Sequence, residues 1–488
     1  MTAATTTLEP AAAAARTPEA SPAAPRRRFR CTVPGLVLAL PAVLITLTAV
    51  ARYLFGRGAI DLVVFDQALW LASRGVEPMV SVIGESLLED HFGLGIFVFA
   101  PLYRIFASPL WLIVAQGVAA WAAVRLIVRR LESSLGALQA AFVGAALLVS
   151  PPVAYALLFD FHSVVLAVPF ALAGFFALED GRPRAALLFG LLATLFRVEV
   201  GAAVAIAFLV WPGPRRGRLQ ASVGLWAYLV VAFYFEKALG HDVYWAIHYG
   251  HLGPSMGAAL ADPFRAAGAL LSADSVAKAF PWLASGAFLA FRSPRRAIPA
   301  VLVALPVLLS RWDGTGSIVF HYGFAPTLLV AAAWIPALQR RPGRSRHVIA
   351  ACGLLALLFG PLLPAFATDD PLGTFAGRYW TPRPGVRCLA GGIPADAGVS
   401  ARTGLTFLAH RARVYLWPYP FQGAPADVLP ADYLAYGDPH KAAGVDYLII
   451  PRHDIALVPP GFVPDGESVS SLRFRREATT APSPVDCR

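Results

Sequence analysis

Long apolar runs dominate the chain and are separated by short segments that carry arginine, glycine and proline. Several runs approach the roughly 20 uncharged residues that a helix needs to cross a hydrocarbon core of about 30 Å. Residues 49–51 are compatible with signal peptidase, but the run before them is long for a signal sequence, so we predict an uncleaved helix. Eleven spans are predicted, at residues 33–51, 110–128, 135–157, 163–179, 185–196, 200–211, 219–237, 277–291, 297–310, 323–339 and 347–366.

Arginine clusters between the apolar runs indicate how the helices are oriented, because Lys and Arg collect in cytoplasmic loops. The clusters lie at residues 26–30, 129–130, 182–184, 215–218, 292–296 and 340–346. All of them are cytoplasmic if residues 52–109 form one outer loop, whose apolar part 92–106 then does not span. That part is short and holds Pro101 and Arg104, which is typical of a juxtamembrane or re-entrant helix.

The ranges 185–196 and 200–211 are short for two separate spans, and one kinked helix over both is the alternative. A single helix would reverse every later loop and move later arginine clusters outside, so we prefer two. The chain then divides into a disordered cytoplasmic tail (1–30), a transmembrane domain (31–366) and an extracytoplasmic domain (367–488).

Short β-like runs replace the long apolar ones after the last predicted helix. Residues 414–417 and 447–450 are typical of strands, and a helix is expected around residues 404–410. We therefore predict a small C-terminal α/β domain. An oxidising exterior permits a disulfide between its cysteines, Cys388 and Cys487, and two free thiols are the alternative.

Composition agrees with a polytopic α-helical membrane protein. Hydrophobic residues make up 57% of the 488 and charged residues 15%, whereas a soluble domain carries roughly 25% charged residues. The net charge of +11 comes from arginines clustered between apolar runs, which argues for a lipid bilayer as partner and against nucleic acid. Heavy use of Ala, Arg, Gly and Pro with few lysines suggests a GC-rich bacterial genome, so we expect the membrane to be a bacterial plasma membrane.

Under this topology the unusual polar residues gather on the outer membrane face. Ionisable residues near membrane depth are costly and suggest function. The candidate site residues are Asp61, Asp66, Asp90, His91, Asp160, His162, Arg197, Glu199, His321 and Tyr322.

Asp61 and Asp66 fall in one predicted helix of the outer loop, over residues 62–73. Asp61 is suited to be its N-cap, with a catalytic role as the alternative. Asp66 lies about 40° from Leu62 and Trp70 around that helix, beside the apolar face. A carboxylate partly shielded from water is suited to accept a proton, so we predict that Asp66 is a catalytic base, with an ion pair as the alternative.

The other candidates come in close pairs. Asp160 can orient His162 only if the helix has ended before them, because residues i and i+2 do not share a helix face. Arg197 and Glu199 have the same spacing, so we expect them not to pair inside one helix. Arg197 then suits a phosphate, which guanidinium binds through two hydrogen bonds, and a salt bridge to another segment is the alternative.

Asp90 is a suitable cap for the helix of residues 92–106, with His91 beside it. We find no P-loop, no dinucleotide-binding glycine pattern, no zinc-type cysteine spacing and no nucleophile elbow in the sequence. We therefore expect no cofactor, with a divalent metal as an alternative that no motif supports.

Four stretches resemble one family. IDLVVFDQALW, EDHFGLGIFVFAPLY, FDFHSVVLAVPFAL and FHYGFAPTLL resemble the domain of unknown function 2079 family of bacterial membrane proteins. The resemblance covers roughly residues 50–460, and its late part includes IPADAGVSARTGLTFLAHRARVYLWP. That family is grouped by similarity with the GT-C membrane glycosyltransferases.

The resemblance implies a transferase that takes sugars from polyprenyl-phosphate carriers. By this resemblance Asp66, or else Asp61, occupies the place of the catalytic base, and Arg197 that of a basic residue near the lipid phosphate. The chain departs from the family pattern at Ser163-Val164, where the family often has Pro-Glu. It also departs at Val198, where the family often has an acidic residue.

The leading hypothesis is an inverting glycosyltransferase that moves a sugar from a polyprenyl phosphate to a hydroxyl of a glycan, lipid or protein on the outer face. A transporter or flippase of lipid-linked or small polar substrates is the first alternative. A non-catalytic scaffold, which the two missing carboxylates favour, is the second.

Overall fold

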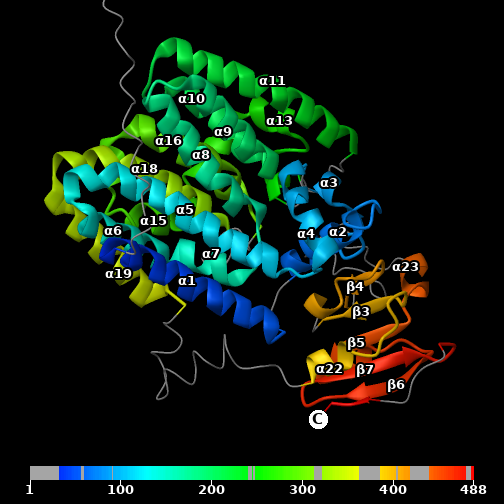
Figure 1. Cartoon of the computed structure of the whole chain (residues 1–488). Helices are drawn as coiled ribbons and strands as arrows, with labels where there is room; N and C mark the ends of the chain where they lie inside the picture. The colour runs from blue at the N-terminus through cyan, green and yellow to red at the C-terminus, as the bar shows by residue number, and fades with distance from the viewer. Residues whose placement is uncertain are drawn as a thin grey trace, which may run out of the picture. The chain divides into compact units, whose positions relative to one another are not determined.

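Long helices form most of residues 33–359 in the computed structural model (Figure 1). The structure describes residues 32–56, 60–90, 92–239, 245, 248–312, 321–361, 385–402, 405–417, 439–479 and 485–487. Helices occur in all eleven ranges where the hydropathy pattern predicts a span. They are α1 (Val33–Leu54), α5 (Leu110–Leu135), α6 (Ala137–Val149), α7 (Pro151–Phe159), α8 (Ser163–Glu179), α9 (Pro183–Phe196), α10 (Val198–Val210), α11 (Arg215–Leu239), α15 (Ala273–Ala284), α16 (Pro294–Leu309), α18 (Phe324–Arg340) and α19 (Ser345–Phe359).

Within the described residues, four helices are long and apolar enough to cross a membrane. They are Val33–Leu54, Leu110–Leu135, Arg215–Phe235 and His321–Arg340. Helices α6 and α7 add a fifth if they count as one span, bent by 55°. The other predicted ranges hold shorter helices, so the number eleven stays a prediction.

Local sequence breaks two of the predicted spans. The bend between α6 and α7 falls at Ser150, before two prolines that have no N–H to continue the hydrogen-bond ladder. The range 277–291 is not one helix, because α15 ends at Ala284 and Phe288 adopts a left-handed φ of 58°. A short 3-10 helix, η3 (Leu289–Arg292), follows.

Helices α9 and α10 form an antiparallel hairpin, so two helices and not one kinked helix occupy residues 183–210. The chain turns at Arg197, which has an extended backbone. A Cβ on Gly201 would lie 2.1 Å from the hydroxyl oxygen of Thr194, and one on Gly190 would lie 3.3 Å from the ring of Phe208. The second contact lies farther from the turn than the first, so α9 and α10 pack side by side in opposite directions.

The arginine clusters meet at one end of the helices, which we call the arginine end. Arg130 pairs with Asp180 at 2.9 Å, and Arg296 pairs with Glu179 at 3.0 Å. The side-chain amide of Gln339 donates to the carbonyl of Arg130 at 2.9 Å. These contacts bring together the clusters around residues 129–130, 182–184, 292–296 and 340–346, as the arginine pattern requires.

The candidate residues lie at the opposite end of the same helices, which we call the site end. Helices α8 and α9 are joined by a short turn at the arginine end, so the start of α8 and the turn at Arg197 share the other end. The short helix η4 (His321–Gly323) is there too, because the ring centroids of His162 and His321 are 3.3 Å apart.

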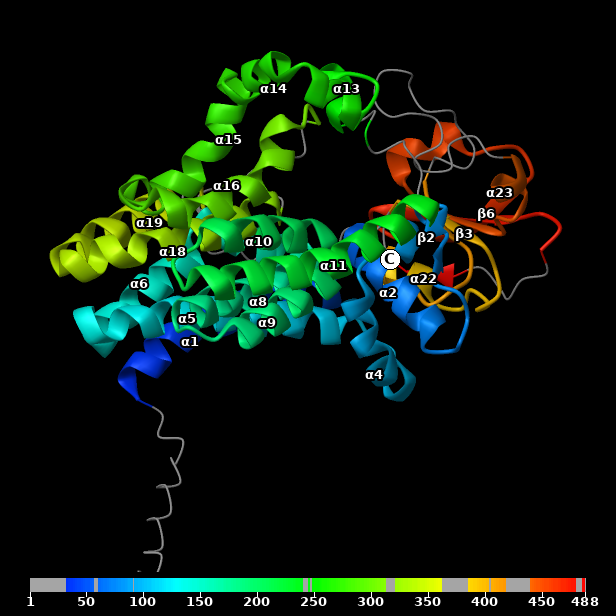
Figure 2. The ribbon, with the colours of Figure 1, turned by 90° about the horizontal axis from the view of Figure 1, so that it is seen from above.

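Short elements fill the segment between α1 and α5 (Figure 2). They are α2 (Ile60–Ala72), β1 (Met79–Val80), β2 (Glu85–Ser86), α3 (Leu87–Asp90), η1 (Leu94–Phe99) and α4 (Ala100–Ile105). The apolar helix Leu94–Ile105 is about 18 Å long at roughly 1.5 Å per residue, too short to cross a bilayer. This agrees with the expectation that residues 92–106 do not span.

The C-terminal residues form a six-stranded mixed sheet with the order β4-β3-β5-β7-β6-β8. Both β-like runs are strands, and four further strands carry no long apolar run. The strands are β3 (Val399–Ala401), β4 (Val414–Leu416), β5 (Tyr447–Pro451), β6 (Phe462–Glu467), β7 (Ser471–Arg476) and β8 (Val485–Asp486). The helix expected around residues 404–410 is shorter than predicted: the described part of that range holds a three-residue 3-10 helix, η6 (Leu405–Phe407).

Cys388 and Cys487 form a disulfide across 99 residues of sequence. Cys388 lies in the short helix α22 (Val386–Ala390), and Cys487 directly follows β8. The bond therefore joins the two ends of the C-terminal domain.

Replacing Cys388 and Cys487 together by alanine should loosen this domain. Loss of a cross-link over such a loop costs about 2–4 kcal/mol. We expect protease to cut the C-terminal domain of the double variant at lower temperature, while the melting of the helical part is unchanged. The control is Cys352→Ala, which removes a buried free thiol of α19. Equal protease resistance of parent and double variant would show that the bond contributes no stability.

Candidate functional site

Helix α2 is buried along most of its length. All its residues from Leu62 to Leu69 are buried, including the two polar ones, Asp66 and Gln67. Asp66 is 1% exposed, so the carboxylate expected beside an apolar face is in fact enclosed on all sides. A carboxylate in such a position requires hydrogen-bond donors.

Two donors from distant segments meet one oxygen of Asp66. Its Oδ1 accepts from the Tyr103 hydroxyl at 2.8 Å and lies 3.0 Å from Nε2 of His410. Burial and the charge of Asp66 raise the pKa of the Tyr103 phenol, which therefore stays protonated and donates. The other oxygen, Oδ2, is buried and has no hydrogen-bond partner among the described residues.

Neighbouring contacts hold His410 in place. Its ring stacks on Trp70 with centroids 6.1 Å apart and an interplanar angle of 4°. The next residue, Arg411, donates to the backbone carbonyls of Ile393 and Pro394. Gln67 donates to the Arg411 carbonyl at 2.7 Å, so α2 and the C-terminal domain are joined at two consecutive residues.

The first turn of α2 is capped from another helix end. The backbone N–H of Leu62 donates to Oδ2 of Asp160 at 2.8 Å. The interpretation of Asp61 as the N-cap is wrong, because α2 already begins at Ile60. The Asp61 carboxylate lies instead 3.5 Å from Nε2 of His162.

The break at residues 160–162 is held by side chains of α1 and α5. Gln116 donates to the carbonyl of Asp160 at 2.8 Å and accepts from the N–H of His162 at 2.9 Å. Arg52 donates to the carbonyl of Phe159 at 2.7 Å. The helix has thus ended before His162, but its carboxylate neighbour is Asp61 and not Asp160.

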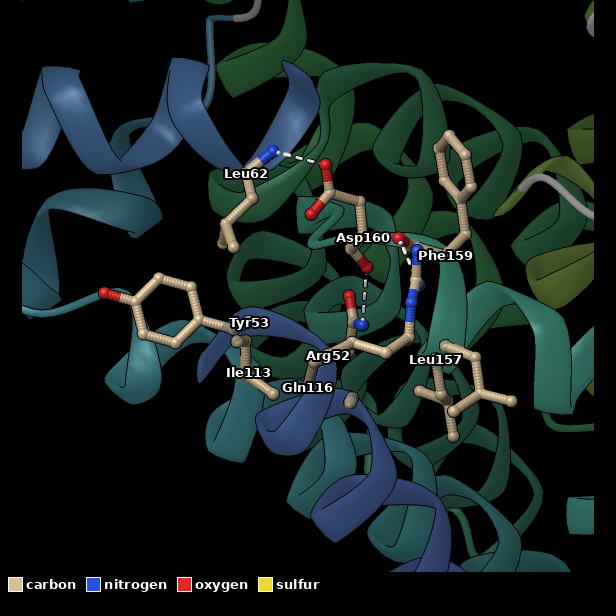
Figure 3. A pocket seen from close by; sticks show the side chains of 10 residues that line it. Arg52, Tyr53, Leu62, Ile113, Gln116, Leu157, Phe159 and Asp160 are labelled. Carbon is tan, nitrogen blue, oxygen red and sulfur yellow. Dashed lines mark hydrogen bonds between the residues drawn. The ribbon is translucent and has the colours of Figure 1, made fainter. Parts of the chain in front are cut away.

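A small pocket opens beside this break (Figure 3). Polar groups on its wall come from Arg52, Tyr53, Gln116 and Asp160, and the remainder is apolar. Burial, followed by the charge of Asp61, raises the pKa of Asp160 well above its usual range.

Aromatic rings connect His162 with a second polar network. His321 stacks on His162, and Tyr322 lies 4.0 Å from His321 between ring centroids. Tyr322 in turn contacts Trp312 edge-on at 6.0 Å, and Trp312 contacts His248 at 5.5 Å. Three of these rings, His162, His321 and Tyr322, belong to residues that the sequence predicts for the site. Trp312 and His248 were not predicted.

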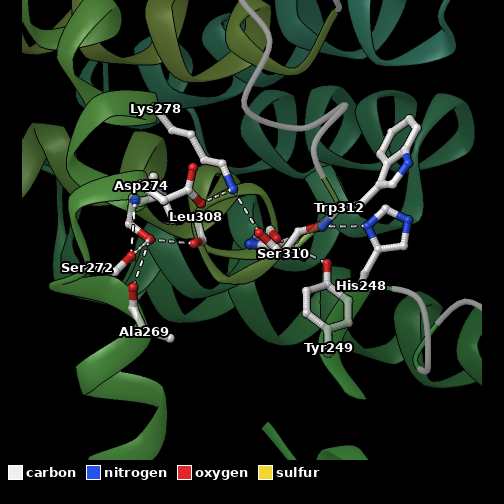
Figure 4. A network of polar contacts seen from close by, with 11 residues as sticks. His248, Tyr249, Ala269, Ser272, Asp274, Lys278, Leu308, Ser310 and Trp312 are labelled. Carbon is white, nitrogen blue, oxygen red and sulfur yellow. Dashed lines mark hydrogen bonds and ion pairs between the residues drawn. The ribbon is translucent and has the colours of Figure 1, made fainter. Parts of the chain in front are cut away.

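The second network contains a buried lysine (Figure 4). Lys278 of α15 donates to the carbonyl of Ser310 at 2.8 Å and pairs with Asp274 at 2.6 Å. The Ser310 hydroxyl is 2.9 Å from Nδ1 of His248. Burial lowers the pKa of His248 to about 4, so its ring is neutral at neutral pH.

Arg197 and Glu199 pair with each other at 3.0 Å, contrary to expectation. The helix-face argument does not apply, since Arg197 is the turn residue between α9 and α10 and only Glu199 is helical. Asp90 does not cap the next helix either, because it ends α3 and η1 begins at Leu94. His91 lies outside the described residues.

The sequence analysis missed Tyr103, His410, Gln67 and Lys278. Tyr103 and His410 lie inside motifs that carry the family resemblance, which was the available signal. No group of three or more His, Cys, Asp or Glu residues suited to a metal ion occurs in the described part of the chain.

The family model described as Predicted membrane protein (DUF2079) matches residues 51–438. The chain belongs to this family. No curated protein matches the DUF2079 chain.

Two crystal structures of ArnT from Cupriavidus metallidurans share the fold of this DUF2079 protein. The structure bound to undecaprenyl phosphate has a TM-score of 0.51 and 16% identity, and the match covers 92% of this chain and 99% of that one. The apo structure has a TM-score of 0.51 and 15% identity, over 89% and 97%. The predicted class, a multi-span α-helical membrane protein with a small C-terminal α/β domain, is confirmed.

Replacing Asp160 by alanine should weaken the start of α2. The change removes the acceptor for the N–H of Leu62, and loss of a helix cap costs about 0.5–2 kcal/mol. Asp160→Asn keeps an acceptor, and a neutral side chain suits a site that raises the pKa of Asp160, so we expect this variant to melt close to the parent. Thermal melting in detergent and hydrogen exchange of α2 measure the difference. Equal losses in both variants would contradict the capping role.

Proposed function

We propose that the protein is an inverting glycosyltransferase that moves a sugar from a polyprenyl-phosphate carrier to an acceptor hydroxyl of a glycan, lipid or protein. The proposal assigns Asp66 as the base and Arg197 as the group that binds the lipid phosphate. The site end of the helices then faces the outside of a bacterial plasma membrane and the arginine end faces the cytoplasm.

The arrangement of Asp66 carries this proposal. A buried carboxylate oxygen without a donor is costly, and such groups in native proteins call for an explanation. Tyr103 and His410 hold Oδ1 and so direct the carboxylate, which leaves Oδ2 as the atom that can take a proton. A base held in this way keeps one oxygen without a donor among the described residues, and that oxygen can take the proton of an acceptor hydroxyl that comes within hydrogen-bond distance.

Atoms and charges balance in a single displacement. The acceptor oxygen attacks the anomeric carbon while its proton passes to Oδ2 of Asp66. The bond between the anomeric carbon and the phosphate oxygen breaks, and its electron pair leaves with the polyprenyl phosphate. The configuration at the anomeric carbon inverts, because attack and departure occur on opposite faces.

Arg197 supports the phosphate assignment by its place. It sits at the site end, at the turn between two helices, and its partner Glu199 is half exposed. A guanidinium group at this position suits an oxyanion that gains charge as the bond breaks. The ArnT structure bound to undecaprenyl phosphate has the same fold, which favours a carrier of that class.

The remaining wall of the proposed sugar site consists of Asp61, His162, His321 and Tyr322, beside the Asp160 carboxylate that caps α2. They come from three segments and meet at the start of α2. Imidazole and carboxylate groups hydrogen-bond sugar hydroxyls well, which favours a sugar at this position. Asp90 and His91 stay candidates from sequence alone.

Asp66→Asn should abolish transfer while the protein stays folded, since the asparagine oxygen can still accept from Tyr103. Loss of a general base lowers the rate about 100-fold to 10,000-fold. The assay follows labelled sugar leaving a panel of polyprenyl-phosphate donors, with purified protein in lipid nanodiscs. Glu77→Gln, an exposed carboxylate of the same segment, is the control.

Transfer by Asp66→Asn at the parent rate would rule out this base. A larger loss in Asp61→Asn would move the role to Asp61. Folded parent protein that releases no label from any donor would favour the transporter or scaffold hypothesis.

Arg197→Gln should lower kcat/KM for the lipid donor about 10-fold to 1,000-fold, because one oxyanion contact is lost. Arg197→Lys keeps the charge without the two-pronged geometry and should recover part of this loss. Arg104→Gln, an exposed arginine of α4, is the matched control. Parent-like kinetics in both Arg197 variants, with unchanged melting, would contradict a role in phosphate binding.

A further inference from the structure

Four arginines line a pocket at the arginine end. Arg292, Arg340, Arg341 and Arg344 surround about 620 Å³ of space open to solvent, and Ala337 is the other lining residue. They come from η3, the end of α18 and the following short helix η5 (Pro342–Arg344). Arg292 is 48 residues before Arg340, so packing and not sequence proximity brings it to the other three.

The four guanidinium groups have no carboxylate partner in the described part of the chain. Other arginines of the same end are paired: Arg130 with Asp180 and Arg296 with Glu179. Partial burial and the charges of Arg292, Arg341 and Arg340 lower the pKa of Arg344. The cluster is therefore a concentration of like charge that the protein does not neutralise.

Membrane orientation alone does not account for this arrangement. Arginines that only set topology can point separately into water, and they need neither convergence nor a pocket. Convergent guanidinium groups match phosphate oxygens, because each offers two parallel N–H donors.

The surroundings of the pocket favour a phosphate carried by a lipid. Phe291 directly precedes Arg292, and Phe288 lies three residues earlier. Both are large exposed apolar residues, and their stacked rings have centroids 6.3 Å apart. An apolar surface beside a cationic pocket suits a molecule with acyl chains and a charged headgroup. Basic pockets between helices on the cytoplasmic side bind such headgroups.

We propose that Arg292, Arg340, Arg341 and Arg344 bind the phosphate of an anionic phospholipid. This site lies apart from the Asp66 site: His321 and Arg340 bound one apolar helical stretch of 20 residues, which is about 30 Å long. Lipid binding at this arginine site does not depend on the proposed transferase activity.

The test measures lipid binding by delipidated full-length protein in detergent. Short-chain phosphatidylglycerol is titrated against the parent and against Arg341→Gln/Arg344→Gln, with short-chain phosphatidylcholine as the neutral lipid. The matched control is Arg215→Gln/Arg216→Gln, which removes the same charge from two exposed arginines at the start of α11. Melting in detergent verifies that every variant is folded.

We expect the parent and the control to prefer phosphatidylglycerol over phosphatidylcholine and the pocket variant to lose at least about tenfold in affinity. Arg292→Gln should reduce binding as well, although it lies in another segment, and Arg292→Lys should reduce it less. Equal loss in pocket and control variants would overturn the proposal in favour of general electrostatic attraction. The absence of any preference for the anionic lipid would also overturn it.

A titration with inorganic phosphate distinguishes a lipid phosphate from a soluble phosphate ion as the ligand. If millimolar phosphate alone binds the parent as well as the lipid does and displaces it, the site serves a soluble anion and the lipid assignment is wrong. If phosphate fails to displace the lipid, the acyl chains contribute and the assignment stands.

Discussion

Burial of a carboxylate in the middle of α2 is the constraint on which the site depends. Asp66 is enclosed on all sides, so its charge requires donors that α2 itself does not supply. Tyr103 provides one from α4, and His410 provides the other from the C-terminal domain. Correct placement of Asp66 therefore needs three segments to come together, and it links docking of the C-terminal domain to formation of the site.

Polar side chains at the helix breaks form hydrogen bonds with unpaired backbone groups, whether or not they also contact substrate. A break between buried helices leaves backbone groups that water cannot reach, and these must find partners within the protein. Gln116 and Arg52 satisfy three of them around residues 159–162. Asp160 satisfies a fourth, at the start of α2. Its carboxylate is thus already engaged, which makes support of α2 a better-founded role for Asp160 than direct contact with substrate.

Local patterns account for what the sequence predicts well. Hydropathy locates the helices because each apolar run must be buried in lipid or protein, and the proline pair after Ser150 explains one bend. The arginine pattern correctly predicts a helical hairpin over residues 183–210. It also correctly predicts that Asp160, His162, Arg197 and His321 lie at one end of the helices.

Partners that are distant in the sequence account for what it does not predict. His410 lies 344 residues from Asp66, and no periodicity connects them. The cap of α2 comes from a residue 98 positions away, so the local preference of Asp61 for a cap does not decide the outcome. Arg197 and Glu199 pair because the helix breaks at Arg197, a conformation that residue spacing alone does not reveal.

Charge is handled differently at the two ends of the helices. At the site end, carboxylates meet imidazole rings, a phenol and backbone N–H groups. At the arginine end, four guanidinium groups have no carboxylate partner among the residues that the structure describes. Helix α18 joins the two regions and is buried along almost its whole length. Arg340 and Arg341 therefore extend from the end of a firmly packed helix and not from a free loop. The backbone of such a pocket is already ordered before an anion enters, so binding has to order only the arginine side chains.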